Sequence, residues 1–329
     1  MKSIAAWIFA MIAAAGLASA AAYDPIKVPD AKIDSQTFEV KDAKRDRSLP
    51  VRVYLPASKK PAPVILFSHG LGGSRDNSPY LGNHWAGRGY AVVFVQHLGS
   101  DESVWKDAAG PERMAAMRKA ASLENYRARV GDIPAVIDAL AGWNAEEKHA
   151  LHGRLDLEHI GMSGHSFGAQ TTQAMAGQSA AAGRVSFAEQ RIDAAVMFSP
   201  SPPRVGDAAT SFASVKIPCL LMTGTLDDSP IGNTSPESRL DVFPHLKQAA
   251  AWQVVFDKAT HMDFGQRPGK VGSPRYHRAI LALSTAFWDA ELKGDKEAKT
   301  WLNGPGAKSV LIAEDKWEMN PQAKAGAIK

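Results

Sequence analysis

Short apolar runs alternate with longer amphipathic stretches along most of the chain. Most of the apolar runs are four or five residues long, which is typical of strands buried on both faces of a parallel sheet. Strands are predicted at 64–68, 91–95, 159–163, 194–198, 219–223 and 253–256. Helices are predicted between and after them, at 80–88, 111–123, 130–140, 169–176 and 277–292. The alternation predicts an α/β fold, with a mainly parallel central sheet and helices on both faces.

The segments outside this alternation complete the predicted organisation. Residues 36–40 and 51–54 are candidate opening strands that pair antiparallel. Residues 265–273 are the most loop-like segment, and the tail after Gly304 is expected to be an ordered appendage or partly frayed. The length permits one large α/β domain or two ordinary ones, and the alternation of strands and helices favours one domain, over residues 21–329.

The first 20 residues have the pattern of a secretory signal peptide. Lys2 supplies a positive charge, residues 4–17 are apolar, and Ala18-Ser19-Ala20 fits a small-x-small cleavage site. As a helix, the apolar stretch would rise only about 21 Å, which is less than the ~30 Å hydrocarbon core of a bilayer. We therefore expect cleavage after Ala20, a secreted or periplasmic protein, and no stable membrane anchor after cleavage.

Composition and charge narrow the possible functions. The chain has 329 residues, of which 45% are hydrophobic, so it can build a sizeable core. Its 38 Lys and Arg against 34 Asp and Glu give a net charge of +4 without a basic cluster, which argues against nucleic-acid binding. Cys219 is the only cysteine, so an intrachain disulfide and a multi-cysteine zinc site are excluded. Because Cys219 lies in an apolar run, we interpret it as a buried small hydrophobe.

The strongest chemical signal is Gly164-His165-Ser166-Phe167-Gly168, which matches the pattern G-x-S-x-G. A predicted strand ends directly before this motif, and a predicted helix begins directly after it. A serine at such a turn is held in a strained conformation that needs glycine neighbours, and its hydroxyl projects at the carboxyl edge of the sheet. The pattern therefore predicts Ser166 as a nucleophile; the alternative is a glycine-rich turn without chemistry.

A serine hydroxyl needs a base near neutral pH, and in this arrangement the acid and the histidine follow the serine in the chain. Three histidines lie beyond the later predicted strands. His261 follows the strand at 253–256 by a short loop, and loops after parallel strands converge on the edge that carries Ser166. His261 is therefore the candidate base. His245 and His277 lie at predicted helix starts, where solvated or capping roles are expected.

A carboxylate must orient this imidazole, and it is expected after the preceding strand. Asp227 and Asp228 lie there, 34 and 33 residues before His261. Asp227, three residues after Gly224, is the predicted acid. Asp228 is the alternative, and a turn or helix-cap role is its other interpretation.

The oxyanion of an acyl-transfer intermediate needs two preorganised N–H donors. One is predicted to be the backbone N–H of Phe167, and the other that of Leu71, in the glycine-rich segment 69–73. A phosphate-binding turn is the alternative for this segment, but G-x-G-x-x-G fails because Arg75 stands where the last glycine belongs. The P-loop and H-E-x-x-H motifs are also absent from the sequence. We expect no cofactor and no catalytic metal.

Three segments together resemble the α/β-hydrolase superfamily: Phe-Ser-His-Gly-Leu-Gly-Gly at 67–73, Gly-His-Ser-Phe-Gly-Ala at 164–169, and the loop that carries His261. The chain is similar to bacterial esterases described as dienelactone-hydrolase-like, whose relatives include platelet-activating-factor acetylhydrolase, chlorophyllase and polyester hydrolases. The resemblance covers about residues 35–320. It implies the α/β-hydrolase fold and hydrolysis of carboxylic esters through an acyl-serine.

Two departures limit what this resemblance carries over. Dienelactone hydrolases use a cysteine where Ser166 stands, so lactone specificity does not follow. In the acetylhydrolase the acid follows an earlier strand, whereas Phe198-Ser199-Pro200 contains no carboxylate here. This difference favours Asp227 as the acid and argues against carrying over the phospholipid substrate.

The substrate pocket is the least specified part of the prediction. Residues 97–127 form a candidate lid, with His97, Trp105, Met114 and Met117 as candidate pocket residues; ordinary core packing is the alternative for the two methionines. The sequence predicts a serine carboxylesterase that acts on a small-molecule ester with a small or medium acyl group. An exopeptidase, a polyester or lipid hydrolase, and a non-catalytic binding module are the alternatives, and the oligomeric state stays open.

Overall fold

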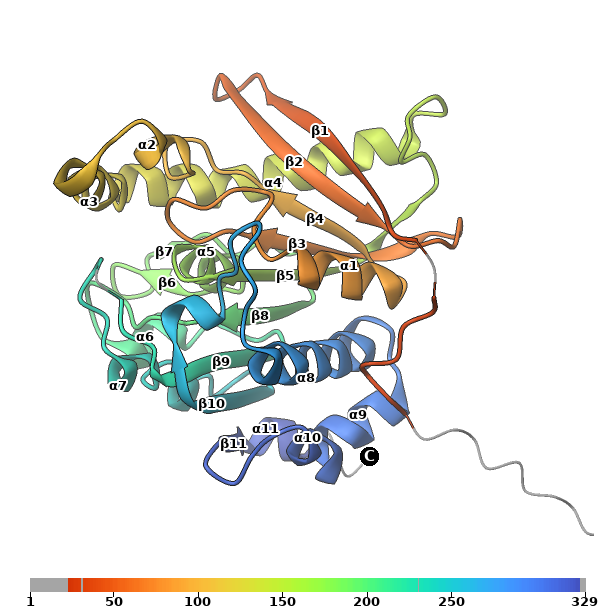
Figure 1. Ribbon diagram of the computed structural model, residues 1–329, viewed down its shortest axis with the longest axis vertical. Helices are drawn as coiled ribbons and strands as arrows, with labels where there is room; N and C mark the ends of the chain where they lie inside the picture. The colour runs from red at the N-terminus through yellow and green to blue at the C-terminus, as the bar shows by residue number, and fades with distance from the viewer. Residues whose placement is uncertain (1–22, 31, 230, 326–329) are drawn as a thin grey trace, which may run out of the picture.

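A sheet of nine strands crosses the centre of the molecule (Figure 1). The computed structural model describes residues 23–30, 32–229 and 231–325. From edge to edge the strands are β1 (Asp34–Asp42), β2 (Arg47–Leu55), β4 (Ala91–Val95), β3 (Ala62–Ser68), β5 (Leu155–His165), β8 (Ala194–Phe198), β9 (Cys219–Leu226), β10 (Ala251–Thr260) and β11 (Lys316–Met319). The strands from β4 to β10 are parallel, whereas β1, β2 and β11 pair antiparallel at the edges. The predicted mainly parallel sheet is confirmed.

Helices lie on both faces of this sheet (Figure 1). One face is covered by α1 (Pro79–Gly87) and α8 (Pro274–Leu292), and the other by α4 (Leu123–Ala145), α5 (Phe167–Met175) and α6 (Ala208–Phe212). The peripheral helices are α2 (Ser103–Lys106), α3 (Gly110–Ala120), α7 (Pro236–Arg239), α9 (Lys296–Asn303), α10 (Pro305–Ser309), α11 (Pro321–Ala325), and the 3-10 helices η1 (Phe243–His245) and η2 (His261–Asp263). A separate hairpin, β6 (Ser179–Ala180) with β7 (Val185–Ser186), follows α5.

The continuous apolar runs arise because each central strand contacts a helical layer on both sides. In β3, Ile65 and Phe67 belong to the core beneath α1 and α8. Their neighbours Val64 and Leu66 belong to the core beneath α4. All four side chains are buried. Double burial makes these strands a rigid support for the loops that leave their carboxyl ends.

The helix predicted over 111–123 is divided in the structure. α3 ends at Ala120, and α4 begins at Leu123. The side chain of Ser122 caps α4, because its hydroxyl accepts a hydrogen bond from the N–H of Asn125 (3.1 Å). Leu123 therefore belongs to α4, whose apolar face is longer than predicted and packs on the sheet.

Two features near the carboxyl end differ from the prediction. The loop predicted before His261 is mostly strand, because β10 continues to Thr260 and pairs again with β9 after a register shift. The tail adds β11, which was not predicted because four residues give too short a pattern. Asn320 fastens this tail by accepting a hydrogen bond from the N–H of Ala251 (3.0 Å). The described part of the tail is therefore an ordered appendage.

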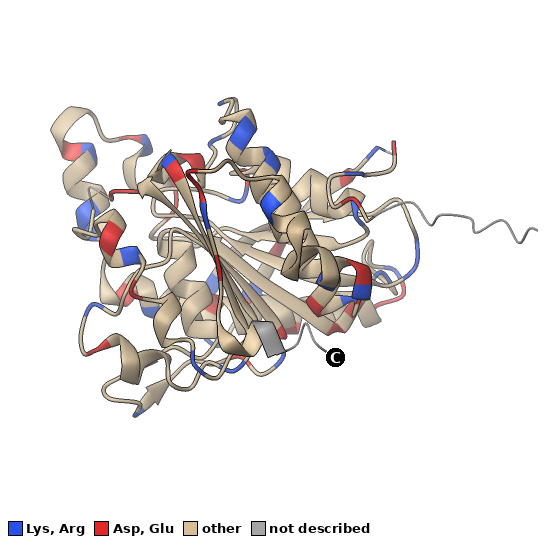
Figure 2. Ribbon diagram, turned by 90° about the horizontal axis from the view of Figure 1, so that it is seen from below, with Lys and Arg blue, Asp and Glu red and all other residues tan. Residues whose placement is uncertain are grey.

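Positively and negatively charged residues are interspersed along the helices and loops (Figure 2). Within the described residues, no helix has both the length and the hydrophobicity to cross a bilayer. The predicted signal peptide, residues 1–20, lies outside the described residues.

Candidate active site

Ser166 lies in the sharp turn between β5 and α5, with φ of 57° and ψ of −113°. A positive φ is strained for a residue that carries a side chain. Two glycines leave room for this turn. A Cβ atom at Gly168 would overlap the main-chain oxygen of Ser68, and one at Gly164 would overlap the main-chain oxygen of Gly168. The strand–turn–helix context expected of the G-x-S-x-G motif is therefore present.

Three side chains from distant parts of the sequence meet at the carboxyl edge of the sheet. Ser166 follows β5, Asp227 follows β9, and His261 follows β10. His261 Nε2 lies 2.9 Å from Ser166 Oγ, and His261 Nδ1 lies 2.7 Å from Asp227 Oδ1. Because an ionised carboxylate only accepts hydrogen bonds, Nδ1 carries the proton, and Nε2 accepts the hydroxyl proton of Ser166. The structure thus brings together the three residues predicted as nucleophile, base and acid.

Asp227, rather than Asp228, contacts the imidazole. The Asp227 side chain is fully buried, and its second oxygen accepts a hydrogen bond from Thr223 Oγ1 (2.8 Å). Burial by itself would raise the pKa of Asp227, but the hydrogen bond from His261 and the charge of Arg239 outweigh it, so the pKa lies below its ordinary value. Asp228 is exposed and faces the cavity in front of Ser166.

Arg239, at the end of α7, is a part of the site that the sequence did not reveal. Its guanidinium is 1% exposed, with Nε 3.0 Å from Asp227 Oδ1 and 2.7 Å from the Asp227 main-chain oxygen. Its Nη1 donates to the main-chain oxygens of Ser199 and Pro200 (both 2.9 Å). Arg239 Nη2 lies 3.2 Å from His261 Nδ1; because that nitrogen carries a proton, this is a contact and not a hydrogen bond. Arg239 therefore fixes the acid and the loop after β8 in one arrangement.

His165, the variable residue of the motif before Ser166, supports the base from behind. Its Nε2 donates a hydrogen bond to the main-chain oxygen of His261 (3.0 Å). Burial, and after it the neighbouring His261, hold the pKa of His165 well below its ordinary value, so the ring stays neutral. The motif gave no signal for this contact, because it depends on where β10 ends in space.

The glycine-rich segment after β3 approaches the serine closely. A Cβ atom at Gly70 would lie 3.5 Å from Ser166 Cβ. Gly72 N–H donates to the main-chain oxygen of Ser100 (2.8 Å), and Gly73 N–H donates to that of Gly70 (3.0 Å). Leu71 N–H donates to no main-chain acceptor among the residues that the structure describes. It remains available as the predicted oxyanion donor.

The second predicted donor, Phe167 N–H, belongs to the first residue of α5. The first N–H groups of a helix have no acceptor within the helix and lie at its partly positive end. Phe167 and Leu71 line the same cavity as Ser166 and His261. Both residues predicted to supply the donors therefore line the cavity beside the nucleophile.

The prediction that His97 lines the substrate pocket is wrong. His97 is fully buried behind the glycine-rich segment, where its Nδ1 donates to Asp132 Oδ2 (2.9 Å) and its Nε2 accepts from Ser68 Oγ (2.9 Å). Arg129 completes the network by donating to Ser68 Oγ (2.9 Å) and to the main-chain oxygen of His69. Burial, and after it the charge of Arg129, lower the pKa of His97 to about 4, so the ring is neutral. The sequence could not distinguish this structural role from pocket lining, because both place a polar residue after a buried strand.

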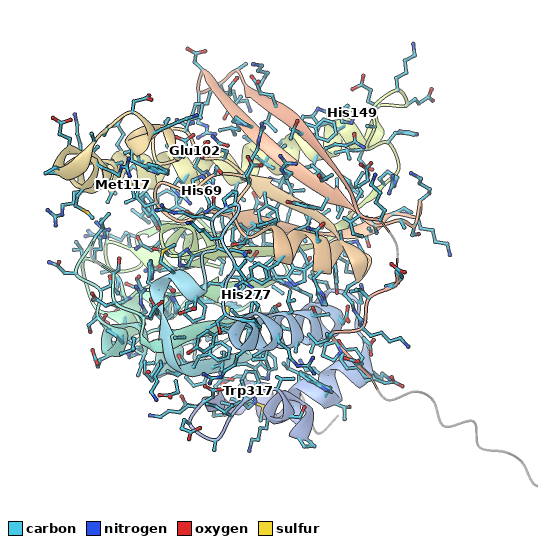
Figure 3. All side chains as sticks on the ribbon, in the orientation of Figure 1. His69, Glu102, Met117, His149, His277 and Trp317 are labelled. Atoms are coloured by element: carbon cyan, nitrogen blue, oxygen red, sulfur yellow. The ribbon has the colours of Figure 1, made fainter. Side chains whose placement is uncertain are left out.

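A cavity of about 390 Å³ opens in front of Ser166; we call it the catalytic cavity. Met114 and Met117 of α3 line it, as predicted. Met117 and His69, both labelled in Figure 3, lie on the same side of the molecule. His277, also labelled there, stacks on Tyr80 with ring centroids 3.9 Å apart and takes no part in the site.

Trp105 does not line the catalytic cavity, which corrects the prediction for this residue. Its indole Nε1 donates to the main-chain oxygen of Gly72 (2.7 Å). Two guanidinium groups also lie over the ring, that of Arg113 at 5.0 Å and that of Arg267 at 5.2 Å from its centre. Trp105 therefore supports the glycine-rich segment from outside. Nothing in the sequence distinguishes this role from direct contact with a substrate.

A mostly parallel sheet with a serine, an imidazole and a carboxylate at its carboxyl edge defines a serine hydrolase of the α/β-hydrolase fold. Residues 46–197 match the family described as X-Pro dipeptidyl-peptidase (S15 family), which shares this fold. The matched stretch contains the glycine-rich segment and Ser166 and ends before Asp227 and His261. No curated protein matches the chain. The match confirms the predicted superfamily and the general class, a serine hydrolase.

Within the described parts of the chain, no three or more His, Cys, Asp or Glu side chains are grouped so that they could hold a metal ion. Cys219 is buried in β9, and burial raises the pKa of its thiol to about 12.

Proposed function

We propose that the protein is a serine carboxylesterase that hydrolyses carboxylic esters with small to medium acyl groups. The observation that carries this proposal is the 2.9 Å contact between Ser166 Oγ and His261 Nε2 beside an open cavity. Leu71 and Phe167, which are proposed to supply the oxyanion donors, line the same cavity. Nucleophile, base and donors are the groups that acyl transfer requires.

The reaction follows from these positions. Ser166 Oγ bonds to the ester carbonyl carbon while its proton passes to His261 Nε2. The N–H groups of Leu71 and Phe167 stabilise the charge that develops on the carbonyl oxygen. The bond to the alcohol oxygen then breaks, and that oxygen takes the proton from His261. Water attacks the acyl-serine by the same route, which releases the acid and restores Ser166.

Labelling and turnover together test this proposal. We expect a fluorophosphonate probe to label Ser166 and the enzyme to hydrolyse p-nitrophenyl butyrate. Ser166→Ala should abolish both, whereas Ser309→Ala, at the end of α10, should retain both. Full turnover by Ser166→Ala, or labelling at a different residue, would overturn the proposal.

An exopeptidase is the second candidate, and two observations favour it. Residues 46–197 are similar to the X-Pro dipeptidyl-peptidase family. The exposed Asp228 lines the catalytic cavity, where its carboxylate can accept hydrogen bonds from a free amino terminus. A higher kcat/KM for alanyl-prolyl p-nitroanilide than for p-nitrophenyl butyrate, lost selectively in Asp228→Asn, would establish the peptidase instead.

We further propose that the enzyme is an exported bacterial esterase of the dienelactone-hydrolase-like group. The motifs at 67–73 and 164–169 support the group, and the pattern of residues 1–20 supports export. After expression in a secreting bacterial host, N-terminal sequencing should give Ala21 as the first residue. A mature protein that starts at Met1 would contradict export.

Residues 97–127 are proposed as a lid beside the catalytic cavity. Support comes from α3, whose Met114 and Met117 line the cavity, and from Trp105, which attaches the segment to Gly72. We expect Trp105→Phe, which keeps an aromatic ring and removes the N–H donor, to increase proteolytic cleavage within 97–127. An unchanged cleavage pattern would contradict the lid.

A further inference from the structure

A second cavity of about 300 Å³ adjoins the catalytic cavity; we call it the side cavity. The two cavities share five lining residues, namely Ala121, Phe167, Gln170, Ser201 and Arg204. Phe167 follows the nucleophile directly, and Gln170 lies one helical turn further along α5. The side cavity therefore lies beside the part of the catalytic cavity that Phe167 and Gln170 line.

The side cavity is mainly apolar and aromatic. Tyr126 stands between Phe167 and Phe187, with ring centroids 6.5 Å and 6.4 Å away. Leu123 and Val205 lie at its exposed rim, where 62% and 87% of their surfaces contact solvent. No carboxylate is among the described residues that line it. Apart from Arg204, which lines both cavities, these surroundings suit an uncharged apolar group rather than an amine or a sugar.

The position of the base decides which arm of an ester enters the side cavity. The leaving alcohol oxygen must lie within hydrogen-bond reach of His261 Nε2, because His261 gives it a proton. His261, Met262 and Gly265 line the catalytic cavity, and neither they nor other residues of the β10–η2 region line the side cavity. The alcohol arm thus begins on the His261 side, and the arm beyond Phe167 is the acyl arm.

We propose that the side cavity is an acyl subsite that takes a medium-length alkanoyl or an aromatic acyl group. This inference rests on the proposed esterase function and names the substrate class of that site. The oxyanion donor Phe167 supplies both the N–H group at the carbonyl oxygen and the aromatic wall along which the acyl group lies. Medium-chain and aromatic acyl esters are then preferred to acetates.

A series of p-nitrophenyl esters tests the subsite, because only the acyl group changes along it. From butyrate to octanoate we expect kcat/KM to rise about fourfold for each added methylene, the gain typical of burying one methylene. In Leu123→Asp and Val205→Asp the ratio of octanoate to acetate kcat/KM should fall at least about tenfold, because a carboxylate now stands at the apolar rim. Both positions are exposed, and position 123 is the first residue of α4, where an acidic side chain is favourable, so the variants should fold.

The matched control is Ile312→Asp, an exposed apolar residue outside both cavities, and its ester profile should equal that of the wild type. A second series, acetates of alcohols of increasing length, should give the same ratios in Val205→Asp as in the wild type. A flat acyl series in an enzyme that hydrolyses the acetate, or a rim variant that changes only the alcohol series, would overturn the acyl subsite alone. Failure of the wild type to hydrolyse any ester or to be labelled at Ser166 would instead overturn the proposed function.

Discussion

Arg239 holds its guanidinium 3.0 Å from the carboxylate of Asp227, and both side chains are buried. The same guanidinium also binds the main-chain oxygens of Ser199 and Pro200, so it connects the acid to the loop after β8. The acid is therefore positioned by the loop after β8 as well as by its own strand. A buried pair of this kind is costly to break, because the remaining partner is left charged and unpaired.

We predict that Arg239→Met lowers stability by about 3 kcal/mol, in the range for breaking a buried ion pair. It should also lower kcat, and more at pH 5 than at pH 8. The pH dependence follows because removing the positive charge raises the pKa of Asp227, so the carboxylate is lost at a higher pH. Urea denaturation and pH–rate profiles measure the two effects. Arg239→Lys, which keeps a positive charge, should retain part of the stability and part of the kcat that Arg239→Met loses. An unchanged pH profile in Arg239→Met would contradict the positioning role.

Replacing Asp227, the proposed acid, should lower kcat far more than replacing its neighbour Asp228. We predict that Asp227→Asn lowers kcat for p-nitrophenyl butyrate about 10³- to 10⁴-fold, since an amide no longer favours the tautomer in which His261 Nε2 can accept a proton. The factor by which Asp228→Asn lowers kcat should be at least about a hundredfold smaller than that for Asp227→Asn, because Asp228 faces the cavity and does not touch the imidazole. Asp241→Asn, an exposed aspartate, is the control. Equal losses of kcat in Asp227→Asn and Asp228→Asn would show that Asp227 is wrongly assigned as the acid.

Gly164 and Gly168, the two glycines of the sharp turn at Ser166, should not tolerate even a methyl group. At Gly168 a Cβ atom would overlap the main-chain oxygen of Ser68, so we predict that Gly168→Ala lowers stability by about 3 kcal/mol and removes fluorophosphonate labelling. Gly142, within α4, has open space where a methyl group would lie, so Gly142→Ala should raise stability by up to about 1 kcal/mol. Thermal unfolding and probe labelling measure both. Wild-type labelling in Gly168→Ala would contradict the proposed reason for the motif.

Lowering the pH should destabilise the protein at pH values well above the range in which carboxylates titrate. Burial holds the pKa of His69, His97 and His165 below the unfolded value of about 6.5, to about 4 for His97. Below pH 6.5 the unfolded chain therefore binds more protons than the folded one. The stability that these neutral rings contribute is complete above pH 6.5 and is lost as the pH falls, by up to about 1.4 kcal/mol per pH unit for each ring. Urea denaturation between pH 7.5 and 5 measures this slope, and equal stability across that interval would contradict it.

The main features of the fold could be predicted because they depend on local pattern. Runs such as 64–68 and 91–95 are apolar throughout, since each strand is covered on both faces, and this signal needs no knowledge of tertiary structure. β11 escaped prediction because its pairing with β10 depends on a tail that returns to the sheet. The break between α3 and α4 depends on one cap, that of Ser122, which the apolar pattern does not reveal.

In the candidate site, too, some residues could be predicted from local pattern and others could not. Ser166 and His261 could be proposed because a sharp glycine-flanked turn and the loop after a parallel strand each predict a position at one edge of the sheet. Arg239 and His165 could not, because their roles depend on contacts that only the folded chain makes: Arg239 binds the Asp227 carboxylate and the main-chain oxygen of Ser199, and His165 binds the main-chain oxygen of His261. His97 was placed wrongly for the opposite reason: its segment was predicted as a lid, but its side chain points inward to Asp132.

The antiparallel pairing of β11 with β10 has a consequence for how the molecule behaves among its copies. β10 is a long, apolar strand, and without β11 its outer row of N–H and C=O groups would be open to a neighbouring chain. β11 covers this row along Trp252–Val255 and leaves an edge strand of only four residues beside the strand from which His261 emerges. A short edge strand offers a neighbouring chain little backbone to pair with, so this end of the sheet is a poor template for intermolecular sheet growth.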